Sequence, residues 1–185
     1  RLMAYSSVEH MGVMALGFGF GGALGVAGAL YHMLNHSLNK SLMFFGAGSM
    51  MRSFETKDIT GIRDVGRRFP VFGALWLAGA VAITGAPPFG LFASEFTVLR
   101  AGLLTSSAWA AIFMAVLLIV IFVGFLNHFR VMYFAPDDRI AAPVRAVSAW
   151  CVLPMWAALI PLLVLGLWWP DSVWRYFGAI AAALR

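Results

Sequence analysis

The sequence has one cysteine, Cys151, in 185 residues, and few charged residues of either sign. A single thiol excludes a disulfide within the chain and a metal cluster built from several cysteines. Charged residues make up 11% of the chain, whereas a soluble globular domain has about 25%. Apolar residues make up 62%, and the mean hydropathy is +0.86. This composition excludes an ordinary soluble domain and predicts an all-α, polytopic integral membrane protein.

About five apolar segments are long enough to be transmembrane helices, because a hydrocarbon core ~30 Å thick needs about 20 helical residues. The third segment contains Gly85–Gly90, and a helix is not expected to continue through its two prolines. We therefore expect one of the five helices to be discontinuous at Pro87-Pro88. The five segments are 3–20, 25–49, 69–99, 108–127 and 147–168.

Polar loops separate some of these segments, and a tail follows the last one. One loop covers 52–68, and another covers 130–145, where Pro136–Arg139 is typical of a turn. We expect residues 1–169 to form a transmembrane domain. Residues 170–185 are weakly amphipathic, so we expect this tail to lie along the membrane interface or against a partner.

The basic residues predict an orientation in the membrane. Most of them lie in loops and not on a face interleaved with aromatic residues, so the formal net charge of +5 does not indicate nucleic-acid binding. Because basic loops stay cytoplasmic, the side with more Lys and Arg is expected to face inward, in a plasma or inner membrane. That side carries Arg1, Arg52, Lys57, Arg63, Arg67, Arg68, Arg130, Arg139 and Arg145, and the other carries Arg100, Arg175 and Arg185.

Titratable residues lie inside the predicted membrane helices, where an ionisable side chain costs roughly 3 kcal/mol or more. His32, His36 and Lys40 are spaced four residues apart, so they share one face of a helix, with steps of about 6 Å. Glu95 follows the predicted helix break, which is tolerated in a membrane where it faces protein or a water-filled cavity. These residues are therefore candidates for a proton or ion pathway.

The chemistry of these side chains suits proton transfer. Histidine titrates near neutral pH, and burial disfavours the charged form of lysine. A purely structural interpretation remains open: Lys40 would extend to the cytoplasmic end, the histidines would join helices, and Glu95 would form a salt bridge. The position of Glu9 and His10 is also left open, either in the polar chain or at the interface, whereas His128 is expected at a cytoplasmic helix end.

Other kinds of site are not indicated. His32, His36 and Lys40 do not predict a metal site, because a protonated lysine is a poor ligand and no cysteine or carboxylate is near in sequence. No phosphate-binding loop, dinucleotide fingerprint or nucleophile motif is present, so the chain is expected to hold no cofactor and no catalytic residue of its own.

Three motifs, in this order, resemble those of one family. Arg1–Gly12 (RLMAYSSVEHMG) resembles the family pattern KRLxAYSSxxHMG, Leu34–Phe45 (LNHSLNKSLMFF) resembles its HxxxKxxxF helix, and Gly85–Phe96 (GAPPFGLFASEF) resembles its broken helix. The family is that of the antiporter-like membrane subunits. It includes the large subunits of complex I (NADH:quinone oxidoreductase), the Mrp sodium/proton antiporters and the membrane arms of energy-converting hydrogenases. The sequences of Tyr31–Lys40 and Ala93–Phe96 are most similar to those of the hydrogenase-4 and formate-hydrogenlyase branch.

The resemblance implies proton translocation coupled to electron transfer, in a multisubunit redox complex whose other membrane and peripheral subunits hold the cofactors. It places His10, His36 and Lys40 on the family's central polar axis and Glu95 at its terminal protonatable position, and His32 extends the same face. The family has about fourteen helices, and this chain resembles the last five, so we expect a C-terminal fragment. A stand-alone Mrp-type sodium/proton antiporter and a membrane scaffold without transport are the alternatives.

Overall fold

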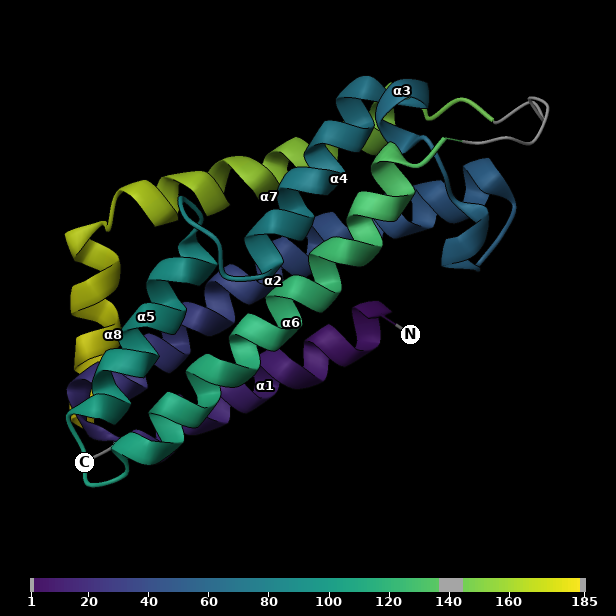
Figure 1. Ribbon diagram of the computed structural model, residues 1–185. Coiled ribbons are helices and arrows are strands. Elements are labelled where there is room, and N and C mark those ends of the chain that lie inside the picture. Colours follow the sequence, from purple (N-terminus) through teal and green to yellow (C-terminus); the bar gives the residue numbers. More distant parts are fainter. Residues whose placement is uncertain (1, 137–144, 184–185) are drawn as a thin grey trace.

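A computed structural model describes residues 2–136 and 145–183 (Figure 1). Regular structure in these residues consists of eight α-helices and one short 3-10 helix, so the predicted all-α class is confirmed. The predictions made for Arg1, Asp137–Arg139 and Arg185 lie outside the described residues. The helices are α1 (Leu2–Phe20), α2 (Gly22–Phe54), η1 (Ile59–Gly61), α3 (Val65–Arg68), α4 (Pro70–Ile83), α5 (Gly90–Leu103), α6 (Ala108–Phe134), α7 (Ala149–Leu167) and α8 (Asp171–Ala183).

The longest helix, α2, extends beyond its predicted bounds at both ends. It begins directly after a turn in which Gly21 and Gly22 have φ angles of 68° and 64°, a region that residues with a side chain rarely adopt. It ends at Phe54, because Glu55 has a left-handed backbone conformation. The apolar run stops several residues earlier than the helix does, which is why hydropathy alone gave the helix too short a range.

The predicted loop boundaries were wrong in two places. The 52–68 loop contains η1 and α3, and Asp58 caps η1 by accepting a hydrogen bond from the backbone N of Thr60. At the other loop, α6 continues to Phe134, so Arg130 lies in a helix. The Arg130 guanidinium donates to Asn127 one turn earlier, an interaction that a continued helix provides.

The predicted interruption of the third segment is present. α4 ends at Ile83 and α5 begins at Gly90, with the two prolines in the connection between them. Gly85 has a φ of 68° in this connection. The chain therefore turns at Gly85, whose lack of a side chain permits this conformation.

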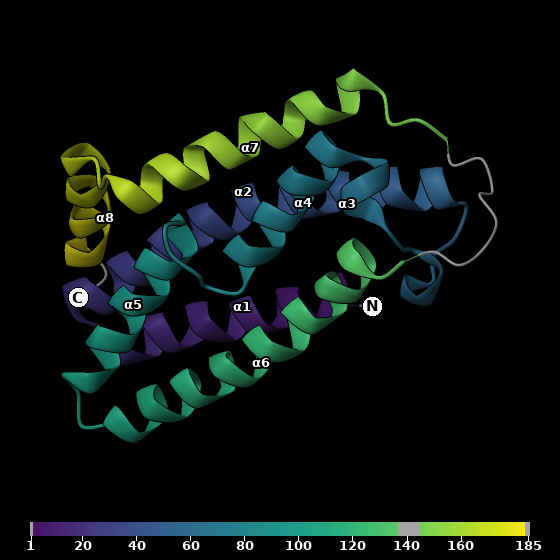
Figure 2. The ribbon, with the colours of Figure 1, turned by 45° about the horizontal axis from the view of Figure 1, so that its top comes forward.

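α2 is the central element of the bundle (Figures 1 and 2). It packs against α1, α4, α5, α7 and α8. The main apolar core joins α2 to α4, α6 and α7 through residues such as Leu42, Trp76, Phe129 and Leu162. α8 lies crosswise at the end of α7 and packs against α2, where the ring of Phe177 meets the ring of Tyr31 edge-on. Tyr31 also donates a hydrogen bond to the carbonyl of Leu165 on α7.

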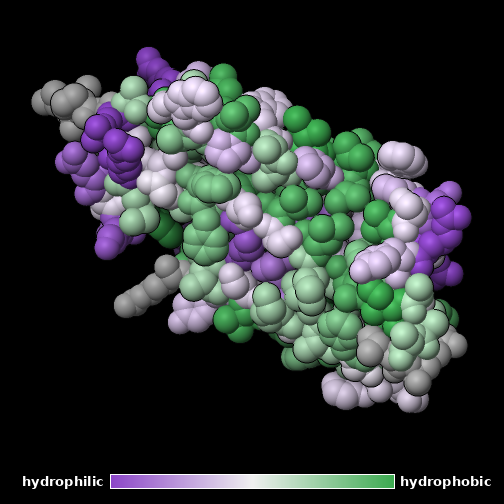
Figure 3. All heavy atoms as spheres, turned by 180° about the vertical axis from the view of Figure 1, so that it is seen from behind, coloured by the Kyte–Doolittle hydropathy of each residue, from purple (hydrophilic) through white to green (hydrophobic). Residues whose placement is uncertain are grey.

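The outer surface is largely apolar between two polar ends (Figure 3). Among the described helices, α6 and α7 are long and apolar enough to cross a membrane. α4 is apolar but has only 14 residues, and α2 carries the polar residues discussed below. Large apolar side chains such as Trp109, Phe113 and Val120 are exposed along α6. These exposed side chains suit contact with lipid or with another apolar protein surface.

Candidate functional site

Three helices bring together the five residues predicted from the sequence. α1 contributes one of them, α2 three and α5 one, and α2 lies next to both of the other helices. All five are buried, and none is more than 8% exposed. The five are His10, His32, His36, Lys40 and Glu95.

His32 joins α2 to both neighbouring helices. Its Nδ1 lies 2.9 Å from the Ser94 hydroxyl on α5, and its Nε2 lies 2.9 Å from Nδ1 of His10 on α1. The Ser94 hydroxyl also donates to the carbonyl of Leu91 at 2.8 Å. Both ring nitrogens of a fully buried histidine are thus used, and they form a hydrogen-bonded line across three helices.

His10 connects this line to the broken helix. Its Nδ1 lies 3.8 Å from Oε1 of Glu95, and its ring also interacts with the backbone of Ile83. Ile83 is the last residue of α4, where a helix end leaves backbone carbonyls without partners inside the helix. The α4 end of the break therefore faces the polar cluster, whereas Pro87 and Pro88 in the connection are exposed.

The Glu95 carboxylate lies against Gly85 in the connection between α4 and α5. A Cβ atom at position 85 would overlap this carboxylate. Oε1 of Glu95 is buried, and it has no hydrogen-bond partner among the described residues. Glu95 is therefore a buried acid at the edge of the break. It lies close to His10, but several hydrogen-bond donors do not fix its position.

His36 completes a group of three histidines. Its ring centre lies 4.7 Å from that of His10 and 6.3 Å from that of His32. Nitrogen atoms of the three rings lie within 4.8 Å of one another. Nδ1 of His36 is buried, and no described protein atom forms a hydrogen bond with it.

Lys40 lies one helical turn beyond His36, and its ammonium group contacts α1. Nζ donates to the carbonyl of Met3 at 2.8 Å and to the Ser6 hydroxyl at 2.6 Å. The side chain is thus held inside the protein, which disagrees with a lysine that extends along lipid to the membrane surface. Lys40 also interacts electrostatically with the half-buried Glu9, which in turn interacts with Glu95.

Sequence reasoning missed two hydroxyl groups in this network and left a third residue open. Ser94 directly precedes Glu95, and Ser6 lies one turn before His10 on α1; neither has a signal of its own in a single sequence. Glu9 belongs to the electrostatic environment of Lys40. His128, by contrast, is exposed on α6, where its ring interacts with the carbonyl of Gly124.

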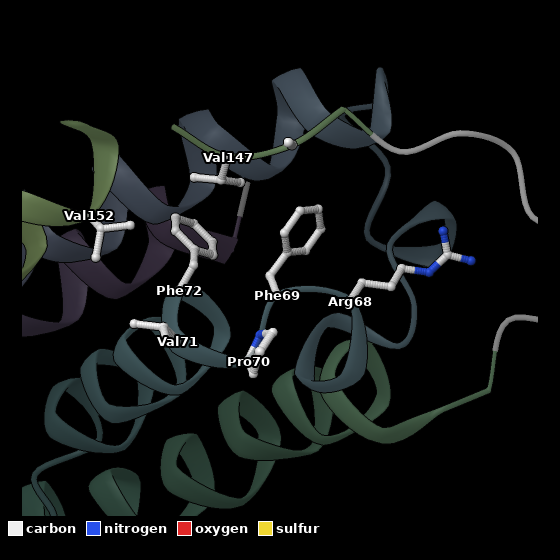
Figure 4. A pocket seen from close by; sticks show the side chains of 8 residues that line it. Arg68, Phe69, Pro70, Val71, Phe72, Val147 and Val152 are labelled. Carbon is white, nitrogen blue, oxygen red and sulfur yellow. The ribbon is translucent and has the colours of Figure 1, made fainter. Parts of the chain in front are cut away.

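A cavity lies at each end of the polar cluster, and another lies away from it. A cavity of about 440 Å³ between α5 and α6 is lined by Glu95, Thr84 and Gly85 together with apolar residues. Another of about 310 Å³ is lined by Met3, Lys57 and apolar residues of α2 and α6. The third, of about 500 Å³, lies between α4 and the start of α7 (Figure 4). Apolar groups such as Phe69, Phe72 and Val147 point into it, and no residue of the polar cluster lines it.

Comparison with known proteins identifies the family. Residues 1–122 match the family described as "NADH:quinone oxidoreductase/Mrp antiporter, TM". This match includes all three motifs and all five buried residues of the cluster. The chain belongs to this family. The resemblance expected from the motifs is thereby confirmed.

Similar proteins agree with this assignment. The chain is 34% identical over its whole length to a hydrogenase-4 component F homolog from Methylacidiphilum infernorum, of which it spans 38%. It superimposes on respiratory complex I from Thermus thermophilus with a TM-score of 0.87 and 25% identity, over 98% of this chain and 38% of that one. It superimposes on the Mrp complex from Dietzia sp. DQ12-45-1b with a TM-score of 0.88 and 18% identity, over 98% of this chain and 42% of that one.

The chain covers only part of each of these proteins. It spans less than half the length of each protein named above. Membrane subunits of this family are found in multisubunit assemblies, such as complex I and the Mrp complex.

Proposed function

We propose that this chain is part of a proton-translocating membrane subunit that works in a redox-driven complex of the hydrogenase or NADH:quinone oxidoreductase type. The observation that carries the proposal is the buried line of hydrogen-bonding groups from Ser94 through His32 to His10, with Glu95 beside it. Such a line can pass protons between buried groups. Electron transfer and its cofactors are assigned to partner subunits, and this chain contributes no redox group.

The hydrogen-bonded line has two proton arrangements with the same heavy-atom positions. In one, Ser94 donates to Leu91, His32 donates from Nδ1 to Ser94, and His10 donates from Nδ1 to His32. In the other, Ser94 donates to His32, and His32 donates from Nε2 to His10. The first arrangement becomes the second when His10 takes up a proton at its far nitrogen and the Ser94 hydroxyl passes its proton to a water molecule, because a hydroxyl and both imidazole nitrogens can donate or accept.

Lys40 and Glu95 serve as the charged groups at either side of the three histidines. The histidines lie between a lysine and an acid in a poorly solvated interior, where charges interact strongly. Protonation of one group therefore changes the proton affinity of the next group. Glu9, half-buried beside Lys40, is assigned to the same electrostatic chain.

The two nearby cavities are proposed as the routes by which protons reach and leave this chain. The cavity lined by Met3 adjoins the carbonyl that binds Lys40, and the cavity between α5 and α6 adjoins Glu95. One route thus reaches each end of the polar cluster. The proposal includes five membrane crossings, counting α4 and α5 as one interrupted helix, in a plasma or inner membrane with the 52–68 segment in the cytoplasm.

Proton pumping by the full-length subunit in its native complex tests the proposal. Lys40→Ala and Glu95→Ala should each abolish most of the acidification of inverted membrane vesicles driven by the native electron donor, while the complex still assembles. His128→Ala, which removes an exposed histidine of α6, should pump like wild type. Wild-type pumping by both alanine variants would reduce these residues to a structural role and favour the scaffold interpretation.

An Mrp-type sodium/proton antiporter is the second candidate, because the chain superimposes on the Mrp complex over 98% of its length. The two candidates differ in what drives transport. A redox complex moves protons when its electron donor is supplied, whereas an antiporter exchanges sodium for protons without a donor. The donor dependence of vesicle acidification, measured with and without a sodium gradient, separates them.

A further inference from the structure

The three histidines and Glu95 form a set of donor atoms that suits a transition-metal ion. The histidine nitrogens lie within 4.8 Å of one another, and Oε1 of Glu95 lies 3.8 Å from Nδ1 of His10. In a tetrahedral zinc site the ligands are ~2.0–2.2 Å from the ion, which places them roughly 3.3–3.6 Å from each other. The imidazole nitrogens would have to approach one another by at most about 1.5 Å to reach that spacing, and Glu95 lies beside His10 as the fourth donor.

The placement of the donors on the helices also fits a metal site. His32 and His36 are four residues apart on α2, the spacing that puts two histidines on one helix face in zinc sites of the HExxH kind. His10 from α1 and Glu95 from α5 approach from the two adjoining helices. Three imidazoles and one carboxylate make a set that zinc and other borderline divalent ions prefer.

The surroundings support a bound cation in three ways. The Ser94 hydroxyl lies 2.9 Å from Nδ1 of His32, which is the kind of outer partner that fixes a metal-binding imidazole with its Nε2 toward the ion. Lys40 is held by Met3 and Ser6 and not by the histidines. The Glu95 carboxyl beside His10 can lose its proton when a cation binds, so that this ligand offsets part of the added charge.

We propose that His10, His32, His36 and Glu95 bind a divalent transition-metal ion such as Zn²⁺, and that the ion and the proton line exclude each other. A metal on Nε2 of His32 replaces the hydrogen bond to His10, so the line from Ser94 to His10 is interrupted. The cavity of about 440 Å³ that reaches Glu95 between α5 and α6 offers the entry path. This binding site goes beyond the proposed function and does not depend on it, because metal binding requires no pumping.

Zinc binding to the purified, chelator-treated native complex tests the site directly. A radioactive zinc titration gives the affinity, and zinc-edge X-ray absorption gives the number of imidazole ligands without interference from other metals. We expect three imidazoles at the zinc of the wild-type complex. His32→Gln should weaken zinc binding at least tenfold, and His128→Gln, a matched change at an exposed histidine, should leave it unchanged.

A second variant keeps the test decisive where His32→Gln disturbs assembly. Ser94→Ala leaves all four ligands in place but removes the outer partner of His32, and should weaken zinc binding ~10- to 100-fold. Equal zinc affinity in wild type and Ser94→Ala, fewer than three imidazoles at the zinc, or loss of binding in His128→Gln would each overturn the proposal. Zinc binding with these properties in a subunit that pumps no protons would support the site and reject the proposed function.

Discussion

The carboxylate of Glu95 occupies the space that a side chain at Gly85 would need. Gly85 lies in the connection between α4 and α5, and Glu95 lies in α5, so the backbone of the break packs directly against the acid. The glycine also has a φ of 68°, where a residue with a side chain costs about 1–2 kcal/mol. A position that looks like a simple turn in the sequence thus has a direct effect on the buried acid.

Gly85→Ala is therefore expected to impair both stability and pumping. The alanine adds the left-handed backbone cost of ~1–2 kcal/mol and displaces the Glu95 carboxylate. Thermal unfolding of the purified complex and vesicle acidification measure the two effects. Gly124→Ala is the control, because a Cβ there meets no atom within 4 Å; an equal effect of both changes would contradict the argument.

Ser94→Ala is expected to stop most proton pumping while the complex still assembles. The change leaves Nδ1 of the buried His32 without its partner, at a cost of roughly 1–3 kcal/mol, and ends the hydrogen-bonded line at α5. Ser37→Ala is the control, because it removes an exposed hydroxyl of α2 that donates, among the described residues, to the carbonyl of Leu34. Pumping that stays normal in Ser94→Ala would mean that the line from Ser94 to His10 carries no protons.

Lys40→Arg is expected to be inactive although it keeps the positive charge. Arginine stays protonated in proteins, so it cannot pass a proton on. Glu95→Lys, in contrast, is expected to keep part of the pumping, because a buried lysine can also take up and release a proton. The measurement is donor-driven acidification, with Lys57→Arg on the exposed 52–68 segment as the control for a lysine-to-arginine change. Full activity of Lys40→Arg would show that Lys40 acts only through its charge.

The proposed orientation predicts which single cysteines react from outside the cell. The segment that follows α2 and the connection between α5 and α6 lie at opposite ends of the bundle (Figure 1). Lys57 in the first and Ser106 in the second are both exposed. In a variant without Cys151, an impermeant thiol reagent added to intact cells should label Ser106→Cys and not Lys57→Cys, because the more basic end stays cytoplasmic. The opposite pattern of labelling would reverse the orientation.

Sequence periodicity was enough to find the face of α2 that carries the cluster. His32, His36 and Lys40 share that face because a helix repeats every 3.6 residues, and all three are buried. The break was equally predictable, since proline and glycine restrict or free the backbone locally. These features depend only on residues near each other in the chain.

The partners across helices could not be predicted in the same way. The pairing of His32 with Ser94 and with His10 depends on how α1, α2 and α5 pack, and the sequence contains no local signal for that packing. The proposed metal-binding set could not be expected from the sequence for the same reason: its third imidazole and its carboxylate come from other helices. The ends of α2 and α6 were also misplaced, because a helix continues beyond the apolar run that first reveals it.

The length of α2 has an electrical consequence. Its 33 residues correspond to about 50 Å at ~1.5 Å per residue, so with the helix along the membrane normal its middle, near His36, lies close to the centre of a ~30 Å hydrocarbon core. A proton that passes between Lys40 and His32 moves about 12 Å along this axis, roughly 40% of the core. A membrane voltage of about 100 mV is worth ~2.3 kcal/mol per charge across the whole membrane. The electrical energy of this one step would then be about 0.9 kcal/mol, which would shift the equilibrium of the step about four- to fivefold.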